Sequence, residues 1–84
     1  MTEYIDEAVS VVLYSNHVSH QVVPIALYWL GKRRQIDIVG LHTTVWEGRN
    51  LIHEFSVTAE STSFRLRFHT ETLQWKLLEV ADHE

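Results

Sequence analysis

Alternation of apolar and polar side chains dominates the middle of this 84-residue chain. The alternation is clearest in residues 55–59 (Phe-Ser-Val-Thr-Ala) and in residues 64–68 (Phe-Arg-Leu-Arg-Phe). A period of two is typical of a β-strand with one buried face, whereas an amphipathic helix repeats about every 3.6 residues. The sequence therefore predicts an all-β fold, in which each strand contributes one face to a shared core.

Six stretches carry this pattern, and turn-forming residues separate them. Pro24 stands near the start of one stretch, where a missing N–H is tolerated, and Gly31 and Gly48 stand in turns. The predicted strands span residues 8–14, 23–30, 35–46, 51–59, 64–69 and 74–80. Residues 6–13 and 73–81 also fit a helical period, so a short terminal helix is the alternative at either end.

Matching of apolar faces predicts how the strands pair, because directly opposed residues of an antiparallel pair lie on the same face. We expect Val57 opposite Leu66 in one hairpin and Trp29 opposite Ile36 in another. These registers place the apolar residues of neighbouring strands on one side of the sheet and leave the polar residues outside.

Gly40 marks a change of face within the longest predicted strand. Ile36 and Ile38 precede it at even positions, whereas Leu41 and Val45 follow it at odd positions. One extra residue restores a common face, and glycine is common at bulges. We therefore predict a bulge or sharp bend at Gly40, which lets one strand serve both sides of a small barrel.

The predicted fold is a small antiparallel barrel of five to six strands, partly open and SH3-like in topology. A meander with an end helix is the alternative. Residues 1–84 are enough for a single domain with one small core. The expected core consists of Val9, Val11, Leu13, Ile25, Leu27, Trp29, Ile36, Ile38, Leu41, Val45, Phe55, Val57, Phe64, Leu66, Phe68, Trp75 and Leu77.

Composition limits the classes of protein to which the chain can belong. Cysteine is absent, which excludes a disulfide framework and any thiolate metal site. No apolar run approaches the ~20 residues of a membrane span, and the acidic first residues are unlike a secretory signal. We therefore expect a cytoplasmic domain that does not associate with a membrane.

Six histidines raise the question of a metal site. His17 and His20 form an H-x-x-H pattern in a polar loop, and His42 or Glu54 would be needed as a third ligand. The spacing lacks the features of a specific motif, so we expect structural or solvated loop histidines, no bound metal and no cofactor. The predicted register also places Glu54 beside His69 on the outer face, as an exposed charge pair.

Aromatic and basic side chains on the predicted outer surface indicate an interaction role. Trp46 and Ile52 would cover each other outside the core, and exposed large apolar side chains favour partner binding or self-association. Arginines mixed with aromatics also suit single-stranded nucleic acid, which the net charge of −4 disfavours. We expect Lys32, Arg33 and Arg34 to lie in a turn. The candidate binding residues are Tyr28, Lys32, Arg33, Arg34, Trp46, Ile52, Arg65 and Arg67.

Motifs for catalysis and nucleotide binding are lacking. The chain has no G-x-G-x-x-G, P-loop, G-x-S-x-G or H-E-x-x-H sequence. We therefore predict a non-enzymatic interaction or accessory module that binds a protein partner or a second copy of itself. A module that binds single-stranded nucleic acid is the alternative, and a histidine-based metal-binding protein is a third hypothesis.

Three short stretches, residues 4–9, 24–32 and 74–77, carry a resemblance that spans nearly the whole chain. Together they resemble a small bacterial domain family of uncharacterised function, with an acidic first strand, a Pro…Trp-x-Gly-Arg hairpin and a closing Trp-x-Leu strand. The chain departs from this pattern at Lys32, where the family favours arginine, and in its longer loop at residues 15–21. Family members occur alone or beside proteins resembling error-prone translesion polymerases. The resemblance implies a link to DNA damage tolerance and no catalytic residues.

Overall fold

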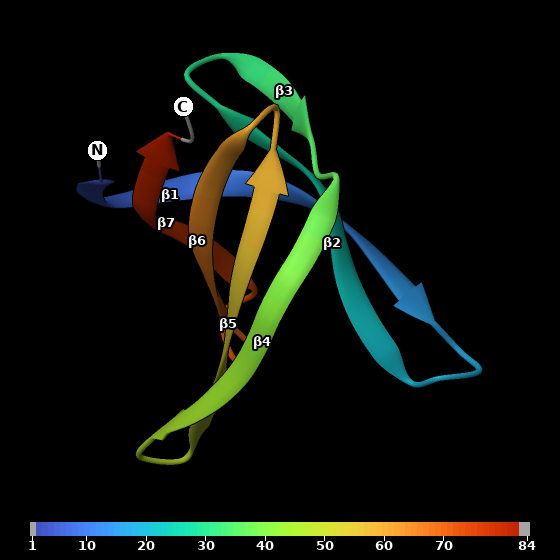
Figure 1. The fold of residues 1–84 in the computed structure, drawn as a ribbon. Helices are drawn as coiled ribbons and strands as arrows, with labels where there is room; N and C mark the ends of the chain where they lie inside the picture. Colours follow the sequence, from blue (N-terminus) through green and yellow to red (C-terminus); the bar gives the residue numbers. More distant parts are fainter. Residues whose placement is uncertain (1, 83–84) are drawn as a thin grey trace.

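The computed structural model describes residues 2–82, which form seven β-strands and contain no helix (Figure 1). The strands are β1 (Thr2–Asn16), β2 (Gln21–Trp29), β3 (Lys32–Gln35), β4 (Ile38–Glu47), β5 (Asn50–Ala59), β6 (Thr62–His69) and β7 (Gln74–Asp82). The all-β prediction is confirmed, with seven strands in place of the five to six expected. The alternative of a terminal helix is wrong, because the first and last described segments pair with each other as β1 and β7. None of the described residues belongs to a helix that could cross a membrane.

All seven strands form one antiparallel sheet in the order β3-β2-β1-β7-β6-β5-β4. The sheet curls into a half-barrel whose two edge strands, β3 and β4, are consecutive in the sequence (Figure 1). The N–H of Ile36 donates to the carbonyl of Ile25 in β2 at 3.0 Å, and the N–H of Asp37 donates to the carbonyl of Thr58 in β5 at 2.8 Å. This corner ties the two edges together at one end, while the β1–β2 and β4–β5 hairpins diverge at the other (Figure 1).

The turn between β2 and β3 changes the predicted pairing. Trp29 lies opposite Lys32, so the expected pairing of Trp29 with Ile36 is wrong. Leu30 and Gly31 form a two-residue turn, with φ of 53° and 72°. Positive φ at both central positions is typical of the tight hairpin turns that match strand twist, and glycine adopts it without steric cost. As a result residues 32–34 lie in strand β3 and not in a turn.

A tighter turn than expected also joins strands β5 and β6. Val57 lies opposite Phe64, so the predicted pairing with Leu66 is wrong by two residues. Glu60 and Ser61 form the turn, both with positive φ. A shift of two residues preserves the face of every side chain, and the predicted burial of this hairpin is therefore unchanged.

The predicted irregularity at Gly40 is confirmed, because the β4–β5 register shifts between Val39 and His42. A Cβ atom on Gly40 would lie 3.3 Å from the carbonyl oxygen of Ser56, which is tighter than an ordinary contact. Beyond the shift His42 lies opposite Phe55. Since Phe55 is buried, the even positions of β4 face the core here and the odd positions face outward.

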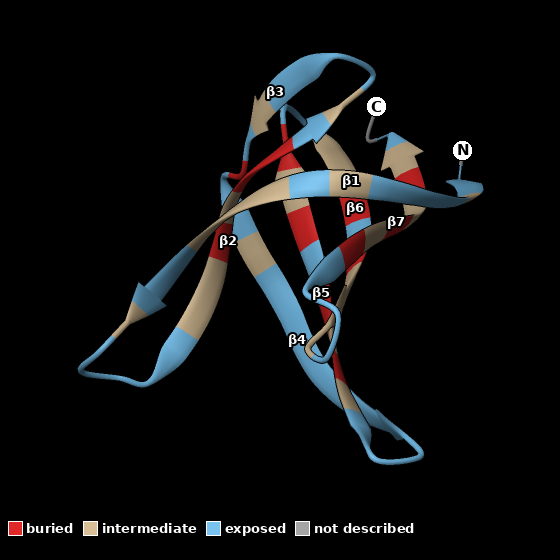
Figure 2. Cartoon of the chain, turned by 180° about the vertical axis from the view of Figure 1, so that it is seen from behind, coloured by how far each residue is buried: buried red, intermediate tan, exposed pale blue. Residues whose placement is uncertain are grey.

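The core occupies the inner face of the half-barrel and draws most heavily on β5, β6 and β7 (Figure 2). Each large buried side chain contributes about 1.5–3 kcal/mol. The prediction of burial is wrong for three residues of β4, which are exposed: Ile38, Leu41 and Val45. The corner at residues 36–37 turns the chain so that Val39, in place of Ile38, packs on the core. The confirmed buried residues are Leu27, Ile36, Phe55, Val57, Phe64, Leu66, Trp75 and Leu77, with Val9, Val11, Leu13, Ile25, Trp29 and Phe68 partly buried.

Candidate interaction surface

The outer edge of β4 is free of backbone partners among residues 2–82, because β4 pairs only with β5. Glu47 lies opposite Asn50 and closes a two-residue loop, which makes that pair hydrogen-bonded. Hydrogen-bonded and non-hydrogen-bonded pairs alternate along an antiparallel ladder. The backbone N–H and C=O groups of His42, Thr44 and Trp46 therefore point away from β5, toward solvent.

Apolar side chains accompany these free backbone groups. On the outer face, Leu41 is 64% exposed and Val45 is 43% exposed, with the Thr43 side chain between them. Residues 38–46 contain no charged residue and no proline. Natural edge strands are usually protected by such residues, since a bare edge pairs with other chains. We call residues 41–46 the β4 edge, and it lacks this protection.

A row of aromatic rings on the inner face holds β4 in place. The His42 ring stacks on Phe55 with centroids 4.1 Å apart, and its Nε2 lies 2.7 Å from Nδ1 of His53. Phe68 and Trp75 continue the row, stacked at 4.6 Å. Burial and the adjacent charge of His53 lower the pKa of His42 below 6.5. The neutral form of His42 is therefore favoured, and its ring, on an exposed residue, contacts the buried Phe55.

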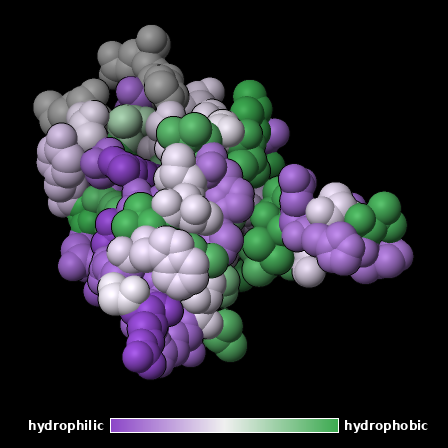
Figure 3. Space-filling view, turned by 90° about the horizontal axis from the view of Figure 1, so that it is seen from below, coloured by the Kyte–Doolittle hydropathy of each residue, from purple (hydrophilic) through white to green (hydrophobic). Residues whose placement is uncertain are grey.

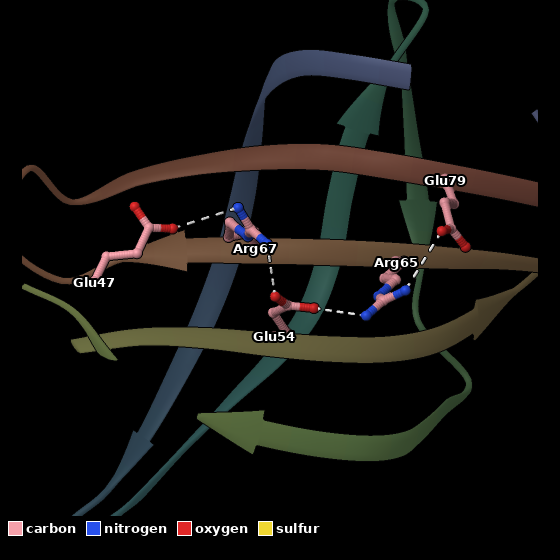
Figure 4. Close-up of polar contacts among 5 residues, drawn as sticks. All are labelled: Glu47, Glu54, Arg65, Arg67 and Glu79. Carbon is pink, nitrogen blue, oxygen red and sulfur yellow. Dashed lines mark hydrogen bonds and ion pairs between the residues drawn. The ribbon is translucent and has the colours of Figure 1, made fainter. Parts of the chain in front are cut away.

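An ion-pair network covers the outer face of β5 and β6 (Figure 4). The Glu54 carboxylate, only 8% exposed, accepts hydrogen bonds from Arg65 at 2.9 Å and from Arg67 at 2.8 Å. Arg65 also contacts Glu79 at 3.4 Å, and Arg67 contacts Glu47 at 3.7 Å. Burial by itself raises the pKa of Glu54, but the hydrogen bonds from Arg67 and Arg65 outweigh it and lower the pKa below 4.5.

This network replaces the predicted pair of Glu54 with His69, which is wrong. Glu54 lies opposite Arg67, and His69 lies opposite Ile52. The hydrogen bond to Glu54 also raises the pKa of Arg65. The alternation predicts Arg65 and Arg67 on the outer face, where they lie. The predicted register differs from the observed one by two residues, and it therefore pairs Glu54 with His69 and not with Arg67.

The basic residues of β3 lie apart from this network. Lys32 contacts Glu60 at 3.0 Å. Arg34 is mostly buried, its guanidinium 5.2 Å from the Trp29 ring, and it approaches Glu60 at 3.7 Å. Arg33 lies over the half-exposed ring of Tyr28 and donates to its hydroxyl at 3.3 Å. The predicted binding residues therefore divide between two separate regions of the sheet.

Trp46 and Ile52 do not cover each other as expected. Trp46 is 66% exposed and lies opposite Leu51, whereas Ile52 is 1% exposed and lies opposite Val45. The one-residue change in the β4–β5 register separates the two side chains onto opposite faces. Trp46 remains an exposed aromatic at the end of the β4 edge, and Ile52 is a covered side chain that offers no binding surface.

The β1–β2 hairpin projects from the body as a separate lobe (Figures 1 and 3). Beyond Val9, β2 is the one strand of the described chain, residues 2–82, that pairs with β1, and Tyr14 and Val18 are exposed. His17 and His20 lie exposed at its turn. Within residues 2–82, no group of three or more His, Cys, Asp or Glu side chains is placed to hold a metal ion. The sixth histidine, at position 83, lies outside the described residues.

In comparisons with known proteins, no family model, no curated protein and no solved structure matches the chain.

Proposed function

We propose that this domain is a protein-interaction module that binds by accepting an extended segment as a further strand on the β4 edge. The observation that carries the proposal is an unprotected edge strand with exposed Leu41 and Val45 beside free backbone groups. Main-chain hydrogen bonds give such strand addition its affinity, and side chains at alternate positions give its specificity. The SH3-like topology, the cytoplasmic location and the bacterial family stay predictions from the sequence.

The charges of the module favour a protein segment over nucleic acid. The β4 edge carries no lysine or arginine to attract phosphate, and phosphate contacts dominate nucleic-acid affinity. Arg65 and Arg67 already contact Glu54, and Lys32 already contacts Glu60. A phosphate would have to displace these carboxylates before it gained Lys32, Arg65 or Arg67 as a partner.

Selection from a library of displayed extended peptides tests the proposal. We expect the wild-type protein to enrich peptides with alternating apolar residues, and Leu41→Lys/Val45→Lys to bind them at least 10-fold more weakly. Tyr14→Lys/Val18→Lys is the matched control, because it adds the same charge to exposed apolar positions of the β1–β2 hairpin. Equal binding by the edge variant, or no enrichment of such peptides, would contradict strand addition at this edge.

Single-stranded nucleic acid is the second candidate function, favoured by the arginines and by Arg33 over Tyr28. A fluorescence titration with labelled single-stranded DNA at about 50 mM salt separates the two candidates, since weak electrostatic binding is strongest at low salt. We expect no saturable binding. Saturable binding that falls with salt and disappears in Arg65→Ala/Arg67→Ala would favour nucleic acid instead.

A further inference from the structure

We infer that the strand added to the β4 edge is β4 of a second copy of this chain, antiparallel and related by a two-fold axis through Thr43. This inference rests on the proposed function and names its partner. Two-fold symmetric pairing is the commonest form of self-association, and it requires a surface that is complementary to itself. Both the backbone and the side chains of the β4 edge meet that requirement.

Backbone geometry restricts the position of the two-fold axis. In a continuous antiparallel sheet, opposed residues lie on the same face. Identical strands satisfy this only when the axis passes through a residue, since the faces alternate along each strand. With the axis at Thr43, His42 lies opposite Thr44 of the second copy, and both have outward backbone groups. Each such pair can exchange two backbone hydrogen bonds, so the ladder continues across the axis.

The side chains favour a two-fold axis at Thr43 over one at Thr44. At Thr43, Leu41 lies opposite Val45 of the second copy, and the two threonines lie opposite each other. This register covers each exposed aliphatic side chain with another, and cross-strand aliphatic and Thr–Thr pairs are favourable. An axis at Thr44 would place Leu41 opposite the carboxylate of Glu47.

Charges also permit this contact. The charged residue of β4 is Glu47, which is drawn toward Arg67 of its own chain at 3.7 Å. With the axis at Thr43, the two Glu47 residues are about 26 Å apart, from a rise of about 3.3 Å per residue. That separation exceeds the Debye length at physiological salt, so repulsion between them is screened.

Disulfide trapping tests the register directly, because the chain has no cysteine of its own. In Thr43→Cys the two thiols meet at a non-hydrogen-bonded pair, where the side chains of opposed residues are closest. We expect mild oxidation to give a covalent dimer at least 10-fold faster than in Ser19→Cys, an exposed hairpin position that reports random collision. Thr44→Cys tests the neighbouring register.

The inference is overturned when Thr43→Cys crosslinks no faster than Ser19→Cys, or more slowly than Thr44→Cys. Sedimentation of the wild-type chain is the second measurement. We expect a weak dimer, and we expect Val45→Lys to abolish it. Peptide binding without any dimer would leave strand addition standing and remove the second copy as its partner. Loss of both would remove both proposals.

Discussion

Nε2 of His42 lies 2.7 Å from Nδ1 of His53, across the strand pair that carries the free edge. At that distance one ring donates a hydrogen bond and the other accepts it, so the contact requires at least one neutral imidazole. The His42 ring also stacks on Phe55. The free strand therefore contacts the core through a pair of rings, and protonation of both rings would remove the hydrogen bond between them.

Mild acid should weaken the fold through His42. Because the pKa of His42 is lowered from 6.5 in the folded chain, the unfolded chain takes up the proton first as pH falls. The free energy of unfolding should therefore decrease as pH falls from about 6.5 toward the lower folded pKa. Urea unfolding at pH 7.5 and 5.5 measures this loss. His42→Gln should reduce the difference between the two pH values, and the exposed His17→Gln should leave it as in wild type.

A second, more acidic transition should depend on Glu54. Its pKa is lowered in the folded chain, so its stabilising contribution is present above pH 4.5 and is lost as pH falls through the folded value. At neutral pH, Glu54→Gln should cost about 1–3 kcal/mol, because it weakens two charge-assisted hydrogen bonds at a buried position.

Glu79→Gln is the control for this network, since Glu79 contacts Arg65 at 3.4 Å nearer the surface. We expect it to cost less than about 0.5 kcal/mol, as exposed ion pairs do. The measurement is urea unfolding at pH 7 and pH 4. A Glu54→Gln variant as stable as Glu79→Gln at pH 7 would show that the paired arginines contribute nothing.

The β2–β3 turn gives a prediction about backbone conformation. Gly31 has φ of 72°, and a Cβ atom added there would meet no other atom of the described residues within 4 Å. Strain and not crowding therefore decides the effect of substitution. Gly31→Ala should destabilise the fold by about 1 kcal/mol, because a Cβ atom disfavours left-handed backbone. Gly31→Asn should cost less, since asparagine tolerates this region. Thermal unfolding compares the two variants, and equal losses would argue against a conformational cause.

The alternation in β5 and β6 was enough to predict their buried faces, because an error of two residues in register leaves every face unchanged. The face of β4 was not predictable in this way. It depends on the corner where Ile36 and Asp37 donate to strands β2 and β5, and these bonds join segments distant in sequence. The alternation therefore predicts a core position for Leu41 and Val45, whereas both are exposed on the edge strand.

The tight turns were missed for a local reason. Leu30 and Glu60 adopt positive φ in these turns. Asparagine and glycine are the residues preferred there, and neither position carries one, so the local sequence does not indicate a tight turn. The turn at Leu30 and Gly31 places residues 32–34 in strand β3, and the turn at Glu60 and Ser61 brings Glu54 opposite Arg67. Trp46 was expected to be exposed and is exposed, since its position beside the loop at Gly48 keeps it near the end of the β4–β5 hairpin.

Substitution of Gly40 tests the bulge on which the outward face of β4 depends. A Cβ atom there would meet the Ser56 carbonyl at 3.3 Å, and a backbone atom in a paired strand gives way less easily than a side chain. We expect Gly40→Val to cost about 1–3 kcal/mol, by crowding at a closely packed position, and Gly40→Ala to cost less. Gly48 lies in the adjacent loop with φ of 62°, and a Cβ atom there would meet no neighbour within 4 Å among residues 2–82, so Gly48→Ala isolates the effect of strain. Urea unfolding measures all three variants. If Gly40→Val unfolds at the wild-type urea concentration, β4 does not approach β5 this closely, and the outward assignment of Leu41 and Val45 loses its structural basis.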